Sequence, residues 1–200
     1  MMMKRRSLHV FGCLTLAAIL GFAQMPAHLS DEQVKEAISH DHGGSVRLSD
    51  VGRLSVCNAQ LPRVFVYSPS GLLWALNASA KKQFLPFEPK ESDTLNALTV
   101  IGEGCSGSAS LCESITRIVL LSDKHGTVVT EAFESASTSH VWQNALGASS
   151  TCASINSKFA MDDVKKVLNT KGEIFIAIFD NARLVYIFQL PGKFIKDLGL

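Results

Sequence analysis

The segment ISHDHGG, residues 38–44, is the best candidate for a metal site in the sequence. His40, Asp41 and His42 offer two imidazoles and a carboxylate, a set that suits zinc or copper, and the glycines that follow could let them converge. Histidines two residues apart do not share a helical face, however, and the site would need a further ligand from elsewhere in the chain. We therefore favour a solvated helix end, where histidine complements the helix dipole.

A second candidate is STSHVWQN, residues 137–144. This segment lies between serine-rich stretches that we expect to be loops, and binding residues concentrate in loops. His140 and Trp142 could form part of a ligand surface, because tryptophan supplies a large amphipathic contact. A core or lid position is the simpler interpretation of Trp142.

The spacing of Gly102, Gly104 and Gly107 matches the G-x-G-x-x-G turn of dinucleotide-binding folds. Such a turn must lead straight into a helix, whereas here a few small residues lead to the next strand-like run at 114–122. We predict that the glycines are turn residues and that no cofactor is bound. Ser106, within GCSGS, resembles a nucleophile elbow but lacks its final glycine and its strand-to-helix setting.

Other polar residues have structural explanations. Asp162 and Asp163 look like a metal or acid–base pair, but they fall in the first turn of a predicted helix, where the dipole favours negative charge. His125 is predicted at a hairpin tip as a polar turn residue. Asn77 begins a glycosylation sequon, and its position in a predicted helix argues against use. The sequence contains no evident set of nucleophile, acid and base.

The N-terminus has the pattern of an export signal. A basic stretch, Lys4 to Arg6, precedes an apolar run from Leu8 to Ala23, which ends in a small-x-small cleavage motif. The run is short for a spanning helix, which needs about 20 apolar residues. We predict a secretory signal peptide at residues 1–23 and a secreted or periplasmic protein; the alternative is an uncleaved membrane anchor.

Cleavage after Ala23 would remove one of the five cysteines and leave Cys57, Cys105, Cys112 and Cys152. An even number of cysteines in an exported chain indicates two disulfides, with three possible connectivities. The short spacing of Cys105 and Cys112 makes a local bridge easy to close, which leaves Cys57 for Cys152. A zinc site is the alternative, but these spacings lack the C-x-x-C knuckles that such sites use.

Length and charge limit the function further. Residues 24–200 suit one domain with a sizeable core, which we divide into an N-terminal helix and linker at 24–62 and a single α+β domain at 63–200. Without the three basic residues of the signal, 16 Lys and Arg stand against 18 Asp and Glu, a net charge of −2. We therefore expect no nucleic-acid partner. We also expect no membrane partner after cleavage, because no polybasic segment is present.

Periodicity predicts the elements. A capping box at Ser30 and Gln33 opens a helix over 30–39, RVFVY at 63–67 is a strand, and Ser68 and Pro69 open a second helix through residue 84. Further helices are predicted at 161–169 and 192–199. Five strand-like runs follow residue 95, at 95–102, 114–122, 126–134, 173–180 and 183–190.

Hairpin turns join several of these runs, so the strands should be antiparallel. The runs at 114–122, 173–180 and 183–190 are apolar on both faces, so we expect them to be central and covered on both sides. The expected fold class is α+β: an antiparallel sheet or small β-sandwich with a few flanking helices, stapled by disulfides. The expected function is an exported, non-enzymatic module that binds a protein, glycan or other envelope ligand. The alternative is a secreted hydrolase or metal-dependent enzyme whose residues are dispersed in the sequence, with His40, His42 and His140 as candidates.

Overall fold

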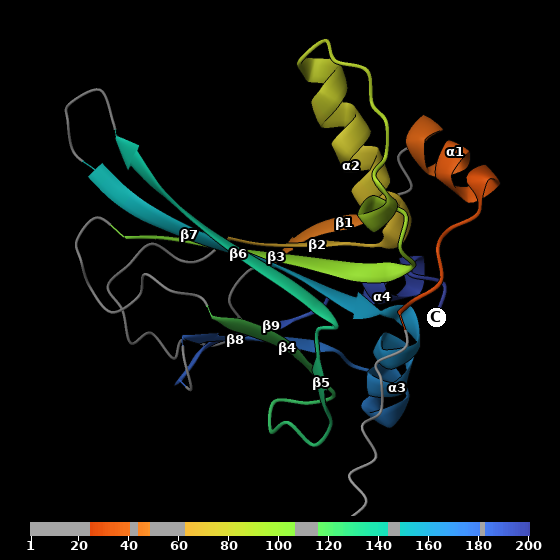
Figure 1. Ribbon diagram of the computed structural model, residues 1–200. Helices are drawn as coiled ribbons and strands as arrows, with labels where there is room; N and C mark the ends of the chain where they lie inside the picture. Colours follow the sequence, from red (N-terminus) through yellow and green to blue (C-terminus); the bar gives the residue numbers. More distant parts are fainter. Residues whose placement is uncertain (1–24, 41–43, 49–62, 107–115, 144–148, 181–182) are drawn as a thin grey trace, which may run out of the picture.

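The computed structural model describes residues 25–40, 44–48, 63–106, 116–143, 149–180 and 183–200 (Figure 1). These residues form an α+β fold with two antiparallel sheets and flanking helices. The helices are α1 (Asp31–Ser39), α2 (Pro69–Lys82), the 3-10 helix η1 (Glu91–Asp93), α3 (Met161–Lys171) and α4 (Gly192–Asp197). No helix in the described ranges is long and apolar enough to cross a membrane.

The first sheet has five strands in the order β1-β2-β3-β7-β6. Its strands are β1 (Ser45–Leu48), β2 (Arg63–Tyr67), β3 (Ala97–Ser106), β7 (Ser149–Ala160) and β6 (Glu134–Gln143). The second sheet has four strands in the order β5-β4-β8-β9. They are β5 (Val129–Glu131), β4 (Arg117–Leu121), β8 (Phe175–Asp180) and β9 (Arg183–Gln189). Every pairing is antiparallel.

The first two helices begin at the residues that the sequence predicts. The Ser30 side chain and the Gln33 side chain form the capping box of α1, and Ser68 caps α2 ahead of Pro69. Gly71 lets the start of α2 cross the backbone before β1, because a Cβ there would lie 1.9 Å from the Gly44 carbonyl oxygen. This close crossing ties the helices to the edge of the first sheet.

One hydrophobic core lies between the two sheets. It combines Val64, Val66, Leu98, Val100, Ile155 and Phe159 of the first sheet with Ile118, Leu120, Ile176, Ile178, Tyr186 and Phe188 of the second. Buried residues of α3 and α4 join the same core at one end of the sandwich (Figure 1). Because side chains alternate along a strand, the other residues of each strand lie on the outer faces.

The prediction that 114–122 and 173–180 are central is confirmed, since β4 and β8 are the two inner strands of their sheet. The same prediction is wrong for 183–190, because β9 is an edge strand. The inward residues of β8 join the main core, whereas Phe175 and Ala177 form a second buried cluster with Val119 and Leu121 on the outer side. A strand that is buried on both faces needs the continuous apolar run that the sequence contains.

Several predicted elements differ from the structure. The five predicted strands are divided between two sheets: 95–102 lies in the first sheet, whereas 114–122, 173–180 and 183–190 lie in the second. The run at 126–134 covers β5 and only begins β6, and the stretches expected to be serine-rich loops form β6 and β7. These two strands are rich in serine, which has weak strand preference, and pairing with a neighbouring strand overrides that preference.

The interpretation of the glycines as turn residues is wrong for two of the three. Gly102 and Gly104 lie inside β3, where their partners in β7 are Ile155 and Ala153. Glycine in a strand leaves room for neighbouring side chains, so the pair does not end the strand. Gly107 lies outside the described residues.

Candidate functional site

The predicted histidine cluster is only partly described. His40 is the C-cap of α1, and its Nδ1 atom lies 2.6 Å from the Ser39 hydroxyl oxygen, while Asp41 and His42 lie outside the described residues. Within the described ranges, no group of three histidine, cysteine, aspartate or glutamate side chains could hold a metal ion.

The structure supports a structural explanation for four polar residues that the sequence analysis considered: Asp162, Asp163, His125 and Asn77. Asp162 and Asp163 lie in the first turn of α3, and Asp163 accepts a hydrogen bond from Lys166 at 2.7 Å. His125 is exposed in the β4–β5 turn, where its backbone N–H donates to Asp123. Asn77 is buried and donates to the Ile38 carbonyl at 2.9 Å, which joins α2 to α1.

The strongest candidate site is the side of the first sheet that faces away from the second sheet. We call it the outer sheet face. The register places its residues in rows across the strands, because directly opposite residues share a face. The row nearest α2 is Tyr67, Thr99, Lys158 and Glu134; the next is Arg47, Phe65, Ile101, Asn156 and Ala136; the third is Glu103, Ser154 and Thr138.

The outer sheet face is covered at one end and open toward the other. Thr99 and Lys158 are buried, beside Ala97 at the start of β3. In the following rows Phe65, Ile101, Glu103, Ser154 and Asn156 are partly exposed, and Ala136 and Thr138 are exposed. In Figure 1, α2 rises from the covered end while β6 and β7 extend past the open end.

An ion pair between a buried lysine and an exposed glutamate closes the covered end. The Lys158 ammonium lies 3.1 Å from a carboxylate oxygen of Glu134 and also donates to the Ser92 carbonyl in η1 at 3.1 Å. The Lys158 side chain is 8% exposed, so its charge requires these partners. This arrangement anchors η1 and the segment after α2 to β7 at the covered end of the outer sheet face.

Aromatic rings and charged groups lie side by side where the covered row meets the open rows. The Arg47 guanidinium lies 6.0 Å from the centre of the Phe65 ring, at the range of a cation–π contact. Partial burial raises the pKa of Tyr67, and the negative charge of Glu103 raises it further. The phenol of Tyr67 therefore remains protonated and able to donate a hydrogen bond across the neutral pH range.

Asn156 adds an unused acceptor to this face. Its Oδ1 atom is buried and accepts no hydrogen bond from the described residues. Buried polar atoms are nearly always paired, and each exception calls for an explanation such as a water molecule or a ligand. The carbonyl lies in the same row as Phe65 and Ile101, at the boundary between the covered and open parts of the face.

Sequence-predicted residues continue the outer sheet face beyond the open rows. The register pairs Cys105 with Cys152 and pairs Cys152 with His140, and Trp142 follows His140 by two positions on β6. These four positions therefore belong to the same face of the sheet, whereas Cys57 and Cys112 lie outside the described residues. His140 and Trp142 lie in a strand rather than in the predicted loop.

The remaining residues of the face were not among the sequence-based candidates. Phe65, Tyr67 and Asn156 carried no motif, and the serine-rich character of β6 and β7 concealed the strands that complete the face. The signal that could have revealed β7 is a partial period of two, in which Ala153, Ile155 and Phe159 fall on one side and the polar Ser154, Asn156 and Lys158 on the other.

Comparison with family models, curated proteins and solved structures gave no match to this chain. Aromatic rings beside a cation, a carboxylate, an amide and hydroxyls can contact apolar faces and hydrogen-bond polar edges of one ligand. Such a surface suits recognition.

Proposed function

We propose that this chain is an exported, non-enzymatic module that binds a ligand of the cell envelope or the extracellular space on its outer sheet face. The observation that carries the proposal is the row of Arg47, Phe65, Ile101 and Asn156, which is partly exposed and contains a buried side-chain carbonyl with no hydrogen-bond donor among the described residues. A surface made only for stability would pair that carbonyl or replace it by an apolar group.

Among envelope ligands, the composition of the face favours a glycan. A sugar ring has apolar C–H faces that pack against aromatic side chains and hydroxyl edges that exchange hydrogen bonds with amide, hydroxyl and carboxylate groups. Phe65 and Tyr67 supply the rings, while Glu103, Ser154 and Thr138 supply the polar groups along the open rows.

A binding screen tests this proposal. The purified protein is mixed with oligosaccharides released from peptidoglycan and from surface polysaccharides, and its melting temperature is measured, because a ligand of the native state raises it. We expect Phe65→Ala and Asn156→Ala to weaken binding by about ten-fold or more, as removal of a central contact does. Val129→Ser, at an exposed position of β5 in the second sheet, is the control and should bind normally.

Export is the second part of the proposal. The basic and apolar pattern of residues 1–23 supports it. Mass spectrometry of the protein recovered outside the cytoplasm should give a mature chain that begins near residue 24. A product that still carries Met1 would contradict export by a cleaved signal.

We further propose that disulfides staple the first sheet. The register supports a bridge between Cys105 and Cys152, since cysteines at partner positions of antiparallel strands meet the spacing that a disulfide requires. The two thiols would lose two protons and two electrons to the disulfide of a thiol oxidant in the exporting compartment. This pairing differs from the Cys105–Cys112 and Cys57–Cys152 bridges expected from spacing, and it leaves Cys57 to pair with Cys112.

A further inference from the structure

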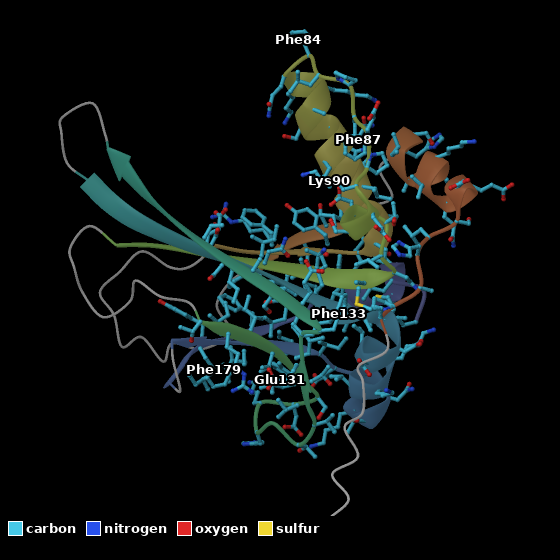
Figure 2. The ribbon with its side chains drawn as sticks, viewed as in Figure 1. Phe84, Phe87, Lys90, Glu131, Phe133 and Phe179 are labelled. Atoms are coloured by element: carbon cyan, nitrogen blue, oxygen red, sulfur yellow. The ribbon has the colours of Figure 1, made fainter. Side chains whose placement is uncertain are left out.

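The C-terminal end of α2 exposes a short apolar segment. Phe84, Leu85, Pro86 and Phe87 follow the helix, and we call them the α2 tip. Phe84 is 96% exposed and Leu85 is 57% exposed, the former being the most exposed large apolar side chain among the described residues. Figure 2 shows Phe84 at the far end of α2, away from both sheets, with Phe87 nearer to them.

The backbone does not explain the choice of phenylalanine at this position. The helix ends with hydrogen bonds from the Phe84 N–H to the Lys81 carbonyl and from the Leu85 N–H to the Ala80 carbonyl. Phe84 has a φ of 57°, the left-handed conformation that usually belongs to glycine at a helix end. The chain thus holds a bulky aromatic residue where glycine would fit better, and it buries almost none of the ring.

The size and shape of the α2 tip favour a lipid surface over a protein partner. A stable protein interface buries about 800 Å² on each partner, with some 20 residues a side, and four residues on a protruding helix end cannot supply this. A bilayer interface accepts a small convex apolar group without a matching pocket, because the bilayer itself is fluid.

Two cations lie beside the apolar residues. Lys81 and Lys82 are exposed in the last turn of α2, directly before the α2 tip. The helix dipole already favours positive charge there, so the apolar residues carry the argument and the lysines add attraction to anionic headgroups.

We infer that the α2 tip inserts Phe84 and Leu85 into the interface of an anionic membrane, with Lys81 and Lys82 at the level of the lipid phosphates. This inference departs from the expectation of no membrane partner, which considered only long basic segments. It concerns peripheral attachment and is independent of ligand binding by the outer sheet face.

Vesicle binding tests the inference. The purified protein is sedimented with vesicles of phosphatidylglycerol and phosphatidylethanolamine, and with vesicles of phosphatidylcholine. Wild type and variants are compared in the same form, so residues 1–24 contribute equally. We expect the wild-type protein to bind the anionic vesicles. Phe84→Gly should weaken vesicle binding by about ten-fold or more, because one aromatic side chain no longer enters the interface. Changing both Lys81 and Lys82 to Gln should weaken vesicle binding less, and this loss should depend on salt.

Phe84→Gly should fold normally, because glycine readily adopts the left-handed conformation. The melting temperature of this variant should equal or exceed that of wild type. Val129→Ser removes a 50% exposed apolar side chain elsewhere and should bind vesicles normally, as should Phe65→Ala on the outer sheet face. In Phe84→Trp, brominated lipids should quench the added fluorescence.

Failure of the wild-type protein to bind anionic vesicles, or equal binding by wild type and Phe84→Gly, would overturn the inference. A partner protein that binds wild type but not Phe84→Gly, in the absence of any vesicle binding, would also overturn it and assign the α2 tip to a protein interface.

Discussion

The two sheets of this protein differ in how many of their faces are covered. The central strands β4 and β8 of the second sheet are buried on both sides: Ile176 and Ile178 of β8 face the main core, and Phe175 and Ala177 belong to a separate buried cluster on the other side. The first sheet is continuously apolar toward the core, whereas its outer sheet face mixes apolar and polar residues and becomes exposed away from α2. The difference separates a sheet with covered central strands from one with an open face, on which we propose that a ligand binds.

The largest expected effect on the free energy of unfolding comes from changing an isoleucine to alanine, which we compare between the two sheets. Ile176→Ala, in β8, empties a fully buried position and should lower the free energy of unfolding by about 2–5 kcal/mol. Ile101→Ala, on the outer sheet face, should cost about 1 kcal/mol or less because its side chain is partly exposed. Urea unfolding measures both. Equal losses would show that the outer sheet face is covered like the second sheet.

The cysteines test whether the open end of the first sheet is held covalently. A Cys105–Cys152 bridge would stabilise the fold by about 4 kcal/mol on the chain-entropy model, whereas a Cys105–Cys112 bridge would contribute about 2.5 kcal/mol. Peptide mapping under non-reducing conditions identifies the pairs, and unfolding of Cys105→Ser gives the magnitude. Free thiols at all four positions would contradict both pairings.

The stability of the second sheet should also depend on acidic pH, through Asp123 in the β4–β5 turn. Asp123 is buried at the end of β4, and the Lys171 ammonium, 2.8 Å away, and the Thr127 hydroxyl lower the pKa of its carboxyl group. A lowered native pKa stabilises the fold above the unfolded pKa, near 4, and this stabilisation is lost as the pH falls below it.

Asp123→Asn should therefore reduce stability at neutral pH and flatten the decline in stability below about pH 4. Denaturant unfolding across this range measures both effects. Asp163→Asn, whose partner Lys166 is exposed on α3, is the matched control and should leave the acid profile nearly unchanged. An identical profile in wild type and Asp123→Asn would show that the turn does not depend on this carboxylate.

The smallest expected effect contrasts two helix ends with the same backbone conformation. Gly172 ends α3 with a φ of 72° and open space around it, while Phe84 follows α2 with a φ of 57°. Gly172→Ala should destabilise the protein by about 1 kcal/mol, and Phe84→Gly should stabilise it by a similar amount. Melting temperatures measure both; destabilisation by Phe84→Gly would mean that the ring makes a contact that stabilises the fold.

The elements that sequence reasoning located correctly are those with local or continuous signals. The capping box of α1, the Ser68 and Pro69 start of α2, the RVFVY strand and the apolar run of β8 are each specified by neighbours in the chain. β6 and β7 carry no such signal, because their serine and threonine residues also suit loops and only pairing with β3 makes them strands.

The sequence by itself determined the helix starts, the α+β class and the strand that is central in the second sheet, because capping side chains and apolar periodicity act over a few residues. The tertiary structure alone decided which side chains share the outer sheet face. Phe65, Glu103, Thr138 and Asn156 come from four strands distant in sequence, and only the register of β2, β3, β7 and β6 brings them into adjacent rows. Register depends on burying one face of every strand at once, a condition that no single segment can express.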